Sequence, residues 1–100
     1  MYIEDMKNSA ARASTLMKAL SSETRLLLLC RISEGEISVN ELADTLDMRP
    51  ASVSQQLSLL RKDGLVKTRR AGQTIYYSLD GEEAIQVISV LHGLYCQNSK

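Results

Sequence analysis

The hydrophobic period of this chain changes once, at Gly64. Before Gly64, apolar residues recur every three to four positions, which is the period of α-helices. After it, residues 65–70 and 73–79 are rich in β-branched residues and tyrosine and flank Ala71-Gly72, a pattern that predicts a two-stranded hairpin. Glycine readily adopts the left-handed conformation that ends a helix, so Gly64 is predicted to separate a helical part from this hairpin.

Two short helices are predicted immediately before this glycine. Ser38-Val39-Asn40-Glu41 is a capping box, and the helix that it begins runs to Leu46. Asp47-Met48-Arg49 is a three-residue turn, and Pro50 begins a second helix that extends to about Lys62. Two helices joined by a tight turn and followed by a hairpin are typical of a winged helix-turn-helix. The predicted fold is therefore mainly α-helical with a β-hairpin wing.

Further helices are predicted on both sides of this unit. Residues 3–20 carry one apolar stripe, the N-cap pair Ser21-Ser22 precedes a helix over 23–32, and a last helix is expected to begin at Asp80. The stripe of the last helix comprises Ala84, Val87, Ile88, Leu91, Leu94 and Tyr95. One hundred residues suffice for a single domain over 1–100. A chain this short buries a modest part of its surface, so the two stripes suit burial against a partner, with an internal core as the alternative.

Basic residues are concentrated between Arg49 and Gln73. The whole chain is formally neutral, but this segment contains six basic residues and one acid, Asp63, so its net charge is +5 and that of the remainder is −5. A basic stretch favours a polyanion such as nucleic acid as the partner, although a solvated charged face is the simpler alternative.

The helix over 50–62 is predicted to present a polar face without acids. Val53, Leu57 and Leu60 share a narrow arc that must face the core, and the opposite arc contains Ala51, Gln55, Ser58 and Lys62. Short polar side chains suit a helix that enters the major groove of double-stranded DNA, where Gln55 can bind an adenine edge. The hairpin would supply phosphate or minor-groove contacts. The predicted DNA-binding residues are Ser52, Ser54, Gln55, Ser58 and Lys62 on the helix and Thr68, Arg69, Arg70 and Gln73 on the hairpin.

The sequence offers little support for an enzyme, a cofactor or a membrane segment. There is one histidine, the five glycines form no phosphate-binding loop, and the two cysteines, at positions 30 and 96, lack the Cys-x-x-Cys spacing of redox enzymes. The longest apolar run, Leu26 to Cys30, is too short to cross a bilayer, and the first five residues include two acids, unlike a cleavable signal. We therefore expect a cytoplasmic, nucleoid-associated protein.

Two motifs carry a resemblance to a known family. S-x-S-Q-x-L-x-x-L-R-x-x-G-L-V begins at Ser52, and G-Q-x-x-Y-Y-x-L begins at Gly72. With the surrounding residues 19–79, they resemble the ArsR/SmtB family of dimeric winged-helix repressors. The resemblance implies a homodimer joined through its first and last helices, bound to an operator that is an imperfect palindrome.

The metal sites of that family do not match this sequence. Its third-helix site needs a Cys-x-Cys-like pair, which "ISVNELADTL" lacks, and its last-helix site needs a D-x-H start and an H-x-x-E finish. Here Glu82 follows Asp80 in place of the first histidine, and His92 is out of step. Zinc requires thiolates or paired imidazoles, so we predict no metal site and expect His92 at the surface or at an interface. A metal-responsive repressor is the weakest alternative.

The two cysteines and their neighbours resemble the dithiol branch of the same family. Cys30 lies in "LLLLCRIS" and Cys96 in "HGLYCQ". Members of that branch sense persulfides or other oxidants. The resemblance implies that the reduced form represses and that a bridge between Cys30 and Cys96, either a disulfide or inserted sulfane sulfur, releases the DNA. Two alternatives remain: an anti-repressor that activates genes by displacing a nucleoid silencer, and a Cys30 that is only a small buried hydrophobe.

Overall fold

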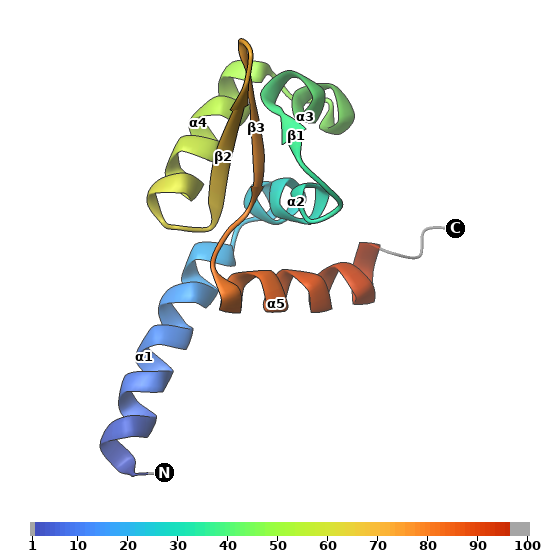
Figure 1. Ribbon diagram of the computed structural model, residues 1–100. Helices are drawn as coiled ribbons and strands as arrows, with labels where there is room; N and C mark the ends of the chain where they lie inside the picture. The colour runs from blue at the N-terminus through green and yellow to red at the C-terminus, as the bar shows by residue number, and fades with distance from the viewer. Residues whose placement is uncertain (1, 97–100) are drawn as a thin grey trace.

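The structure is a computed structural model that describes residues 2–96 (Figure 1). In chain order its elements are α1 (Ile3–Leu20), α2 (Glu23–Ile32), β1 (Ile37–Ser38), α3 (Val39–Leu46), α4 (Pro50–Lys62), β2 (Val66–Ala71), β3 (Thr74–Leu79), α5 (Glu82–Leu91) and the π-helical turn η1 (His92–Cys96). Helices α3 and α4 form the helix-turn-helix, and β2 and β3 form the wing beside α4. The predicted fold is confirmed.

The wing belongs to a three-stranded antiparallel sheet in the order β1-β3-β2. Strand β1 was not predicted, because two residues are too few to show an alternating pattern, and Ser38 also caps α3. The turn of the wing lies at Gly72-Gln73, one residue later than predicted, with φ +65° at Gly72. Glycine at the first position of a two-residue loop is typical of a type II′ turn, whose twist matches that of the strands.

One hydrophobic core joins helices α2 to α5 and the sheet. Its largest completely buried side chains include Leu28 and Leu29 of α2, Leu42 of α3 and Ile88 of α5, together with Val53, Leu57 and Leu60 of α4. The three α4 residues are those predicted to face the core. Each buried side chain of this size contributes about 1.5–3 kcal/mol relative to an exposed one. Helix α4 is therefore fixed in rotation, and its opposite face must point to solvent.

The local signals for helix ends were mostly read correctly. Ser22 caps α2 by accepting a hydrogen bond from the Arg25 amide, and Ser38 and Glu41 form the complete capping box of α3. Asp80, however, does not cap α5. Gly81 is the N-cap residue without a side-chain cap, and its amide donates to Asp80 Oδ1 at 2.9 Å.

Helix α1 projects from the rest of the molecule, whereas α5 lies across α2 (Figure 1). Only Leu20 of α1 is buried, and Ile3, Met6 and Met17 of its stripe are exposed. The stripe of α5 instead enters the internal core, led by Ile88. Within this chain, the middle of the last stripe is therefore part of the internal core, whereas every residue of the α1 stripe except Leu20 is exposed.

The last α-helix ends earlier than its apolar stripe predicts. It stops at Leu91, and the wider π-helical turn His92–Cys96 shifts the phase of the following residues. Leu94 and Tyr95 consequently leave the stripe and are 69% and 80% exposed. Among residues 2–96, no helix combines the length and apolarity needed to cross a membrane.

Candidate nucleic-acid interface and dithiol site

The solvent face of α4 carries the predicted groove-binding residues. All five helix residues are exposed: Ser52, Ser54, Gln55, Ser58 and Lys62. The first turn of α4 contains no acid, and its last turn contains Arg61 and Lys62. Positive partial charge at the helix N-terminus and basic side chains at its end give this face a favourable potential for a polyanion.

The predicted DNA-binding residues of the wing differ in how far their side chains are exposed. Arg70 and Gln73 are exposed near its tip, and Thr68 is half-buried opposite Tyr77. The Arg70 Nε donates to the Gly72 carbonyl oxygen at 3.2 Å, a local contact that leaves the terminal nitrogens of its guanidinium available. Arg70 is therefore well placed to contact phosphate.

Arg69 is already paired. Its Nε and Nη2 donate to the two carboxylate oxygens of Glu36 at 2.8 and 2.9 Å, and its guanidinium lies 5.1 Å from the ring centroid of Tyr76. The hydrogen bonds from Arg69 lower the pKa of the Glu36 carboxyl. To contact a phosphate through these nitrogens, Arg69 must exchange Glu36 for it. No local sequence pattern predicts this pair, because Glu36 lies in a connector 33 residues earlier.

The two cysteines, far apart in sequence, meet at one pocket. Cys30 is half-buried on α2, and Cys96 is exposed at the end of η1. Both line a pocket of about 250 Å³, together with Glu23, Leu26, Leu27, Leu91 and Tyr95. Cysteines from two different elements therefore line one largely apolar space.

The two thiols differ in burial, and Cys30 also has a raised pKa. Burial, followed by the hydrogen bond and charge of Cys96 and the charge of Glu34, raises the pKa of the Cys30 thiol from 9.0 to about 11. Since the thiolate is the nucleophile, Cys30 is mostly protonated at neutral pH and reacts slowly with an external reagent. The exposed Cys96 is the thiol that an external reagent meets first.

His92 has a partner that the sequence analysis did not identify. Its Nε2 lies 2.8 Å from Glu34 Oε2, and its side chain is only 20% exposed. The pair joins the first residue of η1 to the connector after α2, close to Cys30. It therefore contributes to the position of the turn that carries Cys96.

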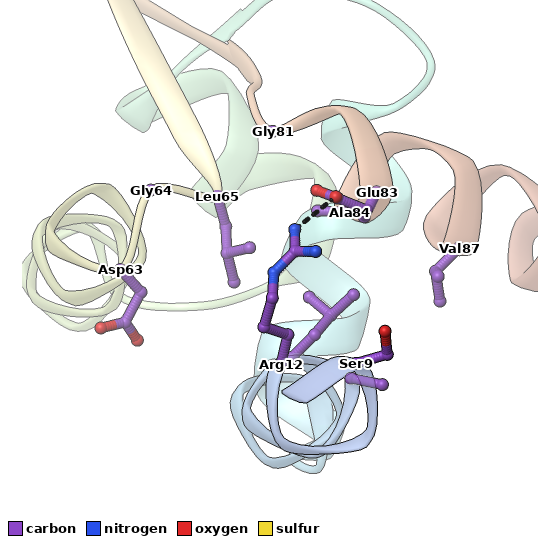
Figure 2. Close-up of a pocket in the computed structure, with 11 residues that line it drawn as sticks. Ser9, Arg12, Asp63, Gly64, Leu65, Gly81, Glu83, Ala84 and Val87 are labelled. Carbon is purple, nitrogen blue, oxygen red and sulfur yellow. Dashed lines mark hydrogen bonds and ion pairs between the residues drawn. The ribbon is translucent and has the colours of Figure 1, made fainter. Parts of the chain in front are cut away.

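A larger pocket, of about 440 Å³, lies between α1, the end of α4 and the start of α5 (Figure 2). Arg12 of α1 reaches Glu83 of α5 across it, with Nη2 and Oε2 2.8 Å apart. Both side chains are exposed, so the pair orients α1 more than it stabilises the fold. Neither cysteine and none of the predicted DNA-binding residues lines this pocket.

No metal centre is formed by the part of the chain that the structure describes. Within residues 2–96, no three His, Cys, Asp or Glu side chains gather closely enough to hold a metal ion. His92 is occupied by Glu34 instead.

Comparison with known proteins identifies the family. Residues 22–68 match the bacterial regulatory protein, arsR family. The transcriptional activator HlyU of Vibrio cholerae is 42% identical over 97% of this chain and 90% of its own length. This chain belongs to the arsR family. The biofilm growth-associated repressor of Xylella fastidiosa is 39% identical over the whole chain and 88% of its own length.

A solved structure shows that the likeness extends to the arrangement of the elements. The crystal structure of HlyU from Vibrio vulnificus superposes with a TM-score of 0.91 at 45% identity, covering 96% of this chain and all of that one. This arsR-family chain is thus similar both to a relative named an activator and to one named a repressor. These relatives are transcriptional regulators rather than enzymes.

Proposed function

We propose that this chain is a homodimeric DNA-binding repressor that releases its operator when Cys30 and Cys96 become bridged. The observation that carries the proposal is the meeting of these two thiols at one apolar pocket in an arsR-family fold. We assign no enzymatic activity and no cofactor to it.

Operator binding is assigned to α4 and the wing. Gln55 reads base edges in the major groove, with Ser52 and Ser54 beside it, because this face is exposed and free of acids. Lys62 and Arg70 supply phosphate contacts and hence the salt-dependent part of the affinity. Ser58, Thr68, Arg69 and Gln73 complete the proposed surface.

The homodimer is assigned to the exposed apolar residues of α1 and α5. Met6 and Met17 on α1, and Ile85 and Val90 on α5, are too many large exposed side chains for two neighbouring helices of a small monomer. Covering them with a second copy places two recognition helices on one duplex. Half-sites about 34 Å apart and an imperfect palindrome follow from the two-fold symmetry.

The bridge forms in two balanced steps. The Cys96 thiolate attacks the sulfane sulfur of a persulfide donor R–S–SH, the donor's S–S bond breaks, and the thiolate R–S⁻ leaves. Cys30 then loses its proton to solvent, and the resulting thiolate attacks the Cys96 sulfur of Cys96–S–SH and expels hydrosulfide. The two thiols are oxidised to a disulfide, and the donor is reduced to a thiol and sulfide. Where the thiols are too far apart for a direct bond, a second donor R–S–SH first extends Cys96–S–SH to Cys96–S–S–SH and leaves as R–SH. The Cys30 thiolate then attacks the middle sulfur and expels hydrosulfide, which gives a trisulfide bridge.

Activation is the second candidate function, because the relative at 42% identity is named a transcriptional activator. In that case the chain displaces a silencing protein from a promoter rather than blocking a polymerase. A promoter–reporter assay in cells with and without the gene separates the two, since loss of a repressor raises expression and loss of an anti-silencer lowers it.

Selection from a random duplex library tests the DNA-binding part of the proposal. The reduced protein is expected to enrich an imperfect palindrome and to bind it at least about 10³-fold more tightly than random duplex at physiological salt. Equal affinity for selected and random duplex would contradict the assignment of a sequence-specific operator.

A further inference from the structure

The connector between α2 and β1 carries two acids, and each is paired with a different element. Glu34 contacts His92 of η1 at 2.8 Å, and Glu36 accepts two hydrogen bonds from Arg69 of the wing at 2.8 and 2.9 Å. Only Gly35 separates them, and its φ of +143° is one that residues with side chains rarely adopt. One residue of backbone therefore links the contact with His92 to the contact with Arg69.

The first end of this connection lies at the dithiol site. Ser33, the residue before Glu34, donates its hydroxyl to the Cys30 carbonyl oxygen at 2.6 Å, so the connector is also tied to the last turn of α2. His92 begins the π-helical turn that ends at Cys96. The contact of His92 with Glu34 therefore lies at the start of the turn that carries Cys96.

The second end lies at the proposed DNA surface. Arg69 is opposite Tyr76 in the β2–β3 ladder, and Tyr76 is opposite Ser38 in β1, directly after the connector. Glu36 competes with DNA phosphate for the same nitrogens of Arg69. A connector that holds Glu36 on Arg69 lowers DNA affinity, and one that lets Glu36 withdraw raises it.

We infer that Glu34, Gly35 and Glu36 couple the dithiol site to the wing within one protomer. Bridging of the cysteines displaces η1, the His92–Glu34 contact passes this displacement to the connector, and Glu36 then retains Arg69 against DNA. In the reduced protein, whose Arg69 is paired with Glu36 in the absence of DNA, phosphate displaces Glu36 from Arg69. This inference rests on the proposed function, and it adds the path by which the bridge reaches the DNA surface.

The test compares the ratio of operator affinities, reduced over bridged, in wild type and in Glu34→Gln, His92→Gln and Glu36→Gln. The bridge is made with diamide, and its completion is checked by intact-protein mass. Glu34→Gln and His92→Gln should leave the reduced affinity within about twofold and lower the ratio by about threefold or more. Glu36→Gln should raise the affinity of both forms and also lower the ratio. Glu82→Gln, which removes the same charge from the exposed start of α5, should change neither quantity.

A second readout does not depend on DNA. The ¹⁵N resonance of Arg69 Nε should shift between reduced and bridged wild type, and this shift should shrink in Glu34→Gln. An unchanged affinity ratio in Glu34→Gln and Glu36→Gln, with a responsive wild type, overturns the coupling and leaves the proposed function standing. If the operator affinity of wild type is the same in the reduced and bridged forms, the proposed function is overturned. The shift of the Arg69 Nε resonance between the two forms then tests the coupling without DNA.

Discussion

Cys30 of α2 and Cys96 of η1 line one pocket. The carboxylate of Glu34, in the connector after α2, contributes to raising the pKa of the Cys30 thiol. The half-buried thiol is held protonated and the exposed thiol is accessible. The exposed Cys96 is therefore expected to attack an external reagent first, and the half-buried Cys30 to resolve the product.

Replacing Cys96 with alanine should lower the pKa of Cys30 from about 11 without returning it to 9.0. Burial, the largest cause of the shift, remains in the variant, whereas the hydrogen bonding and charge of Cys96 are removed. The pH dependence of iodoacetamide alkylation, followed by peptide mass, measures this because only the thiolate reacts. In both proteins the rate should rise with pH through the Cys30 pKa. A midpoint that stays the same or rises in Cys96→Ala contradicts the proximity of the two thiols.

Gln55→Ala should cost about 1–3 kcal/mol on the selected operator and little on random duplex, because its amide reads a base edge. Fluorescence anisotropy on both duplexes gives the two free energies. The matched control is Gln56→Ala, the neighbouring glutamine of α4, which is half-buried at the edge of the core and should bind both duplexes as wild type does. Equal losses for Gln55→Ala on the two duplexes would show that Gln55 does not confer specificity.

Arg70→Ala should weaken binding to operator and random DNA alike, since phosphate contacts carry no sequence information. The slope of log K against log salt concentration should become less steep by about one. Arg69→Ala should also weaken both, by less than Arg70→Ala, because Arg69 gives up Glu36 to bind DNA. If the salt slope of Arg70→Ala equals that of wild type, Arg70 makes no phosphate contact.

Val90→Asp should raise the dissociation constant of the homodimer more than about tenfold, because it would place an unpaired charge in the proposed interface. Ile75→Asp provides the control, since Ile75 is also a partly exposed apolar residue but lies on the wing. Sedimentation equilibrium distinguishes the two. A monomeric wild type at micromolar concentration, or equal dimer affinities for all three proteins, argues against the assigned interface.

Short-range signals allowed most of the fold to be predicted. The capping box at Ser38, Pro50 at the start of α4 and Gly64 after it each act within a few residues, so their effects can be read locally. The helical spacing of Val53, Leu57 and Leu60 predicted which face of α4 points to the core, and all three side chains are completely buried.

Features that depend on tertiary contacts were missed or misplaced. Strand β1 exists because Ile37 and Ser38 pair with Tyr77 and Tyr76, about forty positions later. A strand of only two residues is too short to show an alternating hydrophobic pattern in the sequence. The π-helical turn shifts Tyr95 away from the helical stripe.

The candidate site was predicted residue by residue, but the contacts around it were not. Exposure of Gln55 follows from helical periodicity, whereas the pairs formed by Arg69 and His92 join residues 33 and 58 positions apart. The proximity of Cys30 and Cys96 was an implication of the family resemblance, and it needed α5 to cross α2.

The central claim is that a bridge between Cys30 and Cys96 lowers operator affinity. Fluorescence anisotropy on the selected palindrome, with intact-protein mass recorded on the same samples, tests it most directly. After treatment with a persulfide donor, wild type should release the duplex and show the mass of a linked pair, which is the loss of two hydrogens for a disulfide, plus the mass of any inserted sulfur. Cys30→Ser and Cys96→Ser should bind when reduced and stay bound when treated. A wild type with both thiols linked that keeps full operator affinity contradicts the account, as does a Cys30→Ser variant that releases the duplex normally.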